Sequence, residues 1–119
     1  MALRDKIKQN AQPMLDAGEN IQAVAAGQSN SGWWQAISVI AIFFTKFQSV
    51  VVTDRRILVF DNKRFYMTKP VGINRVLPRT TQIGPPSGLW WKCQSLGPTI
   101  YIHRRFHKDI EQADALRPG

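Results

Sequence analysis

Apolar residues recur at helical spacing near the start of the chain. Within Ala2–Leu15, Leu3, Ile7, Ala11 and Met14-Leu15 recur at this spacing. The other face carries the polar residues Arg4, Lys6, Lys8 and Gln9. This pattern predicts an N-terminal helix within residues 1–17.

A second helical pattern lies near the other end of the chain. Between residues 106 and 116 one stripe is apolar, while Lys108 and Glu111 fall off it. The stripe consists of Phe106, Ile110, Ala113 and Leu116. It predicts a C-terminal helix that covers the rest of the fold.

Short runs of β-branched and apolar residues, separated by Gly, Pro, Asn and Asp, occupy the part of the chain between the two predicted helices. The runs are Ile21–Ala26, Phe47–Thr53, Arg56–Phe60, Phe65–Met67, Ile73–Leu77, Thr80–Ile83, Leu89–Cys93 and Thr99–His103. Tight turns are predicted at Asp54-Arg55 and at Asp61-Asn62-Lys63. The pattern indicates an α+β fold with an antiparallel sandwich or barrel of about seven strands.

The most apolar segment is Trp33–Phe44, inside a predicted insertion at residues 27–46. Its periodicity fits a buried helix or a buried strand, and a short helix over an opening of the sheet is favoured. It is shorter than the roughly 20 residues that a membrane-spanning helix needs. The predicted contacts with a partner or membrane are Trp33, Trp34, Ile37, Ile40, Phe43 and Phe44. Contact with a second copy of the chain is favoured over contact with a bilayer, and complete burial in the core is the alternative.

Composition is consistent with one domain. The chain has 119 residues and one cysteine, Cys93, so it has no internal disulfide framework. No apolar stretch resembling a signal peptide occurs near the N-terminus. The expected location is the cytoplasm, with a peripheral position at the inner membrane face as the alternative.

Positive charge is concentrated in the strand-rich part of the chain. The formal net charge is +8, and the eleven Lys and Arg residues from Lys46 to Arg105 face only Asp54 and Asp61. Such a surface suggests an anionic partner, either lipid headgroups or nucleic acid. A charge that serves only solubility explains the excess equally well.

The run Val50–Phe60, which contains Thr53-Asp54-Arg55-Arg56, resembles the hairpin of bacterial pleckstrin-homology-like domains. The entry Leu15–Glu19 and the ending Tyr101–Ile110 are similar to the corresponding parts of that family. The resemblance implies a pleckstrin-homology-like domain over residues 18–119, with a seven-stranded antiparallel barrel or sandwich and a C-terminal capping helix. It also implies a binding role without shared catalytic residues.

Basic residues near the predicted turns are candidates for anion binding, because guanidinium groups pair with phosphate. They are Arg55, Arg56, Lys63, Arg64 and Lys69. For Arg56 a structural role is favoured, either packing over the sheet or pairing with Asp54 or Asp61. Lys63, Arg64 and Lys69 flank the aromatic residues Phe65 and Tyr66, a combination that can also bind single-stranded nucleic acid.

Catalytic motifs are not apparent in the sequence. His103, His107 and Glu111 have the spacing of metal ligands on one helix, but the predicted helix begins only at about Phe106. We therefore expect no metal site, no cofactor and no enzymatic activity. The predicted function is a non-enzymatic pleckstrin-homology-like module that binds a protein or an anionic membrane surface and can self-associate. A basic nucleic-acid-binding β-barrel is the alternative.

Overall fold

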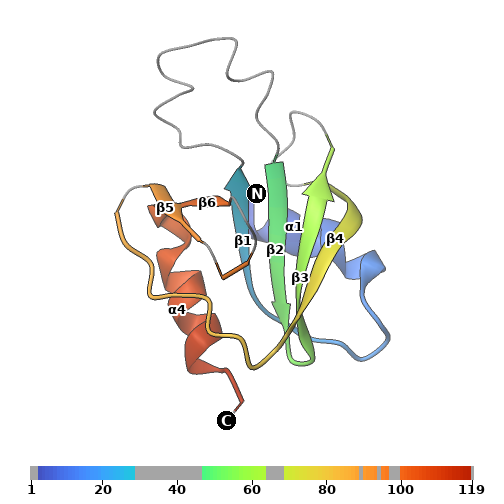
Figure 1. The fold of residues 1–119 in the computed structure, drawn as a ribbon. Coiled ribbons are helices and arrows are strands. Elements are labelled where there is room, and N and C mark those ends of the chain that lie inside the picture. The colour runs from blue at the N-terminus through green and yellow to red at the C-terminus, as the bar shows by residue number, and fades with distance from the viewer. Residues whose placement is uncertain are drawn as a thin grey trace.

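The computed structural model describes residues 3–28, 47–63, 69–88, 90–93, 95–96 and 100–118. Two α-helices and six strands form this part of the chain (Figure 1). The helices are α1 (Leu3–Ala11) and α4 (His107–Ala115). The strands are β1 (Ile21–Gln28), β2 (Phe47–Thr53), β3 (Arg56–Asn62), β4 (Pro70–Pro78), β5 (Trp90–Lys92) and β6 (Tyr101–His103).

The six strands form one open sheet in the order β4-β3-β2-β1-β6-β5, and every pair of neighbours is antiparallel. In Figure 1, α1 lies behind the sheet and α4 lies beside β1. The predicted α+β class is confirmed. A seventh strand and a pleckstrin-homology-like topology stay predictions.

The predicted hairpin is confirmed by the pairing of β2 with β3. Val50 lies opposite Val59, and Asp54 and Arg55 form the turn between the strands. The Thr53 hydroxyl fixes this turn by accepting the backbone N–H groups of Arg55 and Arg56, each at 3.1 Å. The predicted turn at residues 61–63 is wrong in part, because β3 continues through Asn62.

The C-terminal helix packs as predicted over most of its stripe. Phe106 is fully buried in a 3-10 turn that leads into α4, and Ile110 and Ala113 are also buried. Lys108 and Glu111 are exposed. The prediction for Leu116 is wrong: α4 ends at Ala115, and the Leu116 residue is 49% exposed.

One predicted strand, Thr80–Ile83, does not form. The chain makes a turn at residues 79–80 and then runs irregularly through residues 81–87. The backbone N–H groups of Ile83 and Gly84 donate to the carboxylate of Asp114, each at 2.8 Å. A side chain of α4 therefore satisfies the backbone groups that a neighbouring strand would have bound.

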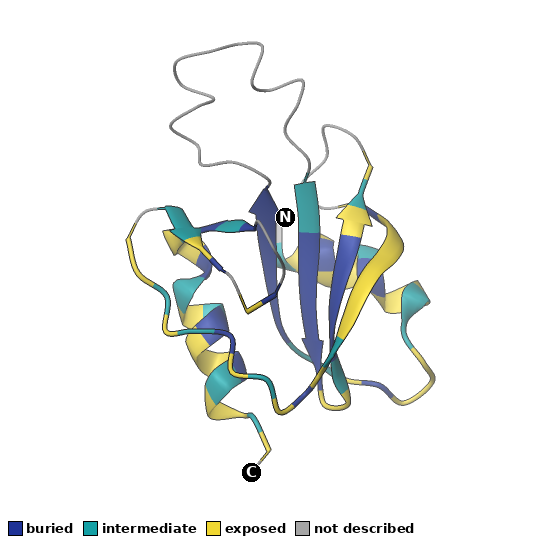
Figure 2. Cartoon of the chain, viewed as in Figure 1, coloured by how far each residue is buried: buried dark blue, intermediate teal, exposed yellow. Residues whose placement is uncertain are grey.

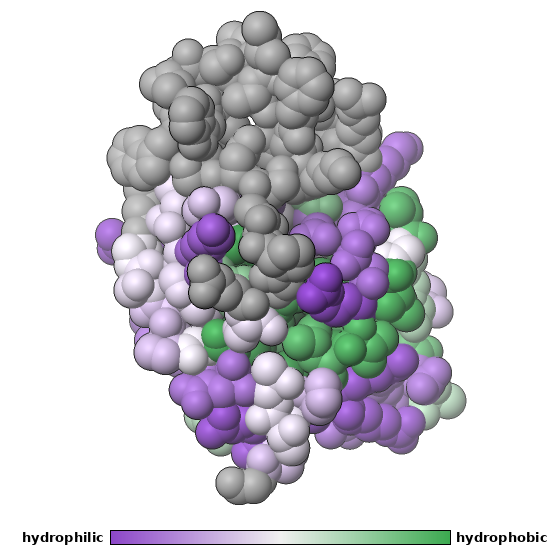
Figure 3. All heavy atoms as spheres, viewed as in Figure 1, coloured by the Kyte–Doolittle hydropathy of each residue, from purple (hydrophilic) through white to green (hydrophobic). Residues whose placement is uncertain are grey.

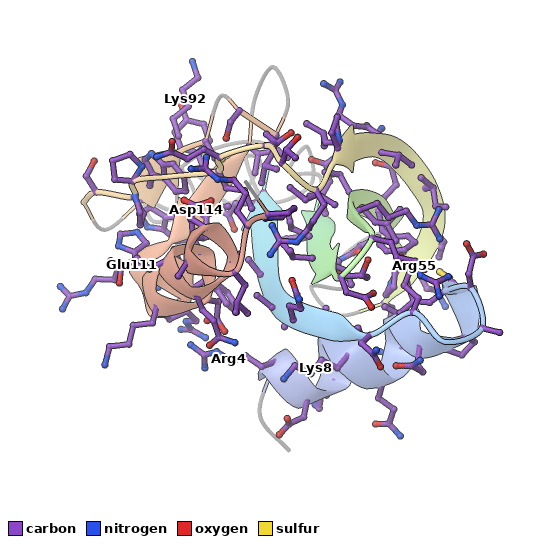
Figure 4. The ribbon with its side chains drawn as sticks, turned by 90° about the horizontal axis from the view of Figure 1, so that it is seen from below. Arg4, Lys8, Arg55, Lys92, Glu111 and Asp114 are labelled. Carbon is purple, nitrogen blue, oxygen red and sulfur yellow. The ribbon has the colours of Figure 1, made fainter. Side chains whose placement is uncertain are left out.

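The two terminal helices contact each other. Arg4 of α1 donates from Nε to Asp109 Oδ2 at 2.8 Å and from Nη2 to the carbonyl of Arg105. Its guanidinium carbon lies 5.4 Å from the centre of the Phe106 ring. Figure 4 shows Arg4 on the side of α1 that faces α4.

None of the helices within the described residues is long and apolar enough to span a membrane. The apolar segment Trp33–Phe44, with all six of its predicted contact residues, lies outside the described part of the chain.

Candidate functional site

The two hairpin arginines have different surroundings, and Arg56 is held by Glu19. The Nε and Nη2 of Arg56 donate to the two carboxylate oxygens of Glu19 at 2.9 and 3.0 Å. Thr53 donates to the same carboxylate at 2.6 Å, and Asp16 Oδ2 lies 3.6 Å from Arg56. This arrangement, the Glu19–Arg56 clasp, links the segment before β1 to the turn after β2.

The clasp has the properties of a structural ion pair. The Glu19 side chain is completely buried, whereas a quarter of the Arg56 side chain is exposed. Hydrogen bonding from Arg56 outweighs desolvation and lowers the pKa of Glu19 to about 2. Arg56 therefore does have a structural role, but its predicted partners, Asp54 and Asp61, were wrong. The two hairpin arginines do not converge on one anion site.

Acid should weaken the clasp. The pKa of Glu19 is lowered from 4.5 to about 2 on folding, so its stabilising contribution is complete above pH 4.5 and is lost as pH falls towards 2. The shift corresponds to about 3 kcal/mol. We expect urea denaturation to show that Glu19→Gln lowers the free energy of unfolding at pH 6 and that the difference from wild type shrinks towards pH 2. A difference that stays constant over this range would contradict the assignment.

Arg55 is exposed at the turn, and Asp54 beside it accepts the backbone N–H of Asn20 at 3.0 Å. Lys63 and Lys69 are also exposed, and they lie together because the Lys63 N–H donates to the Lys69 carbonyl at 2.8 Å. Arg64 is outside the described residues. The structure thus places Lys63 and Lys69 at one end of β4 and leaves Arg55 at the opposite end of β3.

Strand β4 exposes apolar side chains, three of them on or next to the predicted strand Ile73–Leu77. Val71, Ile73 and Val76, named here the β4 surface, are 61%, 50% and 52% exposed. Figure 2 shows the contrast with β2 and β3, whose central residues are buried. Figure 3 shows hydrophobic residues on the molecular surface on the side where Figure 1 places β4.

The register places Ile73 and Val76 of the β4 surface on one face of the sheet. Ile73 is opposite Phe60 and Val76 is opposite Leu58, two positions apart on β3. Leu58 and Phe60 lie on one face of the sheet because they are two positions apart on β3, and directly paired side chains lie on the same face. Ile73 and Val76 therefore share that face, although they are three positions apart on β4. The register shift at Asn74 makes this spacing possible, and a second shift, between Asp61 and Asn62, falls at Val71.

The opposite face of β4 carries polar side chains and also Leu77, which is opposite Ile57 and packs against the core. The Asn74 amide donates to both oxygens of Asp61, at 3.3 and 3.2 Å, and Arg75 is opposite Val59. Arg75 is exposed. Among the described strands β4 pairs only with β3, so its outer edge carries backbone groups with no strand beside them.

The histidines serve local packing. His103 Nδ1 accepts the backbone N–H of Arg105 at 3.0 Å, and the ring stands edge-on to Trp90 with centroids 5.0 Å apart. The His107 ring is likewise edge-on to Trp91. Desolvation, followed by the nearby arginines, lowers the pKa of His103. Within the described ranges no three His, Cys, Asp or Glu side chains cluster as metal ligands would.

A small hollow adjoins Trp90 and His103, with a volume of about 290 Å³. Its lining also includes Ala26, Gly27, Gln28, Phe47, Arg105 and Phe106. Among the described residues that line it, none carries a carboxylate or a thiol. Cys93 is buried elsewhere, and desolvation raises the pKa of its thiol, which keeps it in the unreactive protonated form.

Sequence reasoning missed Arg79, which is 5% exposed. Its guanidinium donates to Gln22 Oε1 at 2.7 and 3.1 Å and to the Ala113 carbonyl at 2.8 Å, so it joins β1 to the end of α4. Desolvation lowers its pKa. No local pattern in the sequence distinguishes Arg79 from the exposed Arg75.

Comparison with protein-family models, with curated proteins and with solved structures found no significant match to this chain.

Proposed function

We propose that this chain is a non-enzymatic binding module of the pleckstrin-homology-like kind, and that it binds an extended segment of a protein partner along β4. The observation that carries the proposal is the exposure of Val71, Ile73 and Val76 on a strand whose neighbour β3 is buried over Ile57–Phe60. The assignment to this kind of domain rests on the resemblance of the Thr53–Arg56 hairpin and on the element order.

Strand addition suits the chemistry of this edge. Backbone N–H and C=O groups of an edge strand can pair with an incoming strand, while the side chains provide apolar contacts. Natural edges are usually protected by proline, charge or bulges. β4 has proline at its two ends, Pro70 and Pro78, the charged Arg75 and two register shifts, and between these it still exposes apolar side chains.

A protein partner fits this surface better than nucleic acid or a bilayer does. Binding of single-stranded nucleic acid relies on aromatic side chains that stack with bases, and interfacial membrane anchors are rich in Trp. The large hydrophobic residues exposed within the described ranges are aliphatic: Val71, Ile73, Val76 and Leu116.

The proposal predicts binding of extended peptides at β4. Short peptides that alternate valine with serine, glutamate or lysine provide the probes, and backbone amide chemical shifts report the site. We expect at least one peptide to shift amides of β4 and β3. Replacing Val71, Ile73 and Val76 together with Thr should weaken that peptide about tenfold, because each change removes apolar contact area but keeps a β-branched side chain.

Leu116→Thr is the matched control, because it removes an exposed apolar side chain from the end of α4. It should leave peptide affinity unchanged. The proposal fails if none of the three peptides shifts β4 at about 1 mM, which corresponds to the weak limit of specific binding. It also fails if single-stranded oligonucleotides or anionic vesicles bind the wild-type protein and the β4 triple variant binds them with the same affinity.

A further inference from the structure

We infer that the segment bound along β4 is acidic, with apolar and acidic side chains on opposite faces of the incoming strand. This inference rests on the proposed function, because it specifies the partner of the same surface. It follows from the charges beside β4, from the different side chains on the two faces of β4, and from the positive net charge of the whole chain.

The charges around β4 are unbalanced. Among the described residues of the range 61–78, Lys63, Lys69 and Arg75 are exposed and Asp61 is the acidic residue, which leaves an excess of three minus one, or two positive charges. Asp61 is already bound: its carboxylate accepts the Asn74 amide and, at 3.1 Å, Gln48 Nε2. An incoming anion would therefore meet a positive surface whose one carboxylate is engaged.

The two faces of β4 give the partner its pattern. Side chains of a strand alternate between faces, so a strand added beside β4 places one set next to Ile73 and Val76. The other set lies on the face of Asn74 and Arg75. Apolar residues suit the first face and carboxylates suit the second, because a carboxylate pairs with the Arg75 guanidinium.

A second copy of the chain does not fit this requirement. Each copy carries a formal net charge of +8. Pairing of β4 with β4 would bring Lys69 and Arg75 of one copy near those of the other, and like charges on adjacent strands are destabilising. An acidic segment of another protein avoids both the repulsion between two positively charged chains and the like charges on adjacent strands.

Charge reversal at β4 tests this inference. The alternating valine–glutamate, valine–serine and valine–lysine peptides are titrated into wild-type protein, and amide shifts of β4 give the affinities. We expect the glutamate peptide to bind about fivefold more tightly than the serine peptide and the lysine peptide to bind most weakly, as for contacts between partly exposed charges. Added salt should reduce the difference.

Arg75→Glu should reverse the order of the glutamate and lysine peptides, whereas Lys108→Glu, at an exposed position on α4, should not. Equal affinity of the three peptides at β4 would overturn the acidic preference and leave the proposed function standing. No shift at β4 with any peptide would overturn both. Sedimentation that shows self-association lost in the Val71, Ile73 and Val76 triple variant would replace the acidic segment with a second copy.

Discussion

Replacement of Arg56 by Ala is expected to lower the free energy of unfolding by about 3–5 kcal/mol, the usual cost of removing one partner of a buried ion pair. The Glu19 carboxylate, completely buried in the intact clasp, would lose its guanidinium partner and keep the Thr53 hydroxyl and the Asp16 backbone N–H as donors. Its pKa would rise, because the main cause of its low value is the hydrogen bond from Arg56. Urea denaturation at pH 7 measures the loss.

Arg55→Ala is the matched control, because the neighbouring side chain has the same chemistry but is exposed. Its effect should stay within about 0.5 kcal/mol, as for most surface substitutions. The double variant Glu19→Gln/Arg56→Met removes both charges together, and it should recover part of the stability lost in Arg56→Ala. Equal losses in Arg55→Ala and Arg56→Ala would show that the clasp does not stabilise the fold.

Phe106→Ala is expected to be comparably damaging, at about 3–5 kcal/mol, because it removes a large side chain from a packed core. Phe106 is fully buried and belongs to the same apolar cluster as Ile102 and Ile110. It also contacts the guanidinium of Arg4, so its loss would loosen α1 as well as α4. Thermal and urea denaturation of the same samples measure the effect.

Leu116→Ala provides the comparison for Phe106, since it lies on the same predicted stripe but is 49% exposed. A loss of less than about 1 kcal/mol is expected there, because much of the side chain is already in water. If Leu116→Ala were as damaging as Phe106→Ala, the orientation of α4 against the sheet would have to differ from the one described.

The parts of the fold that sequence predicts well depend on local patterns. The β2–β3 hairpin was predicted because two β-branched, apolar runs flank the turn residues Asp54 and Arg55. The burial of Phe106 and Ile110 was predicted because the helical period alone puts them on one stripe. Both signals reside within a few residues of the chain, where propensity and periodicity are informative.

The parts that were missed depend on contacts between distant segments. Glu19 is the partner of Arg56 across 37 positions of sequence, and composition alone does not distinguish it from Asp54 or Asp61. Thr80–Ile83 has a strand-like composition, but Asp114 binds its end instead. The exposure of β4 was missed because an edge strand and a central strand can have the same apolar content.

The contact of Arg4 with Asp109 also bears on how the protein folds as it is made. These residues are 105 positions apart, so the bond cannot form until the segment carrying Asp109 has left the ribosome. At a synthesis rate of about 5–20 residues per second, α1 waits roughly 5–20 seconds for that partner. During this interval Ile7 and Ala11 can pack against β1 and β2, but the side of α1 that faces α4 stays uncovered. The contact of Arg4 with Asp109 therefore belongs to a late step of folding during synthesis.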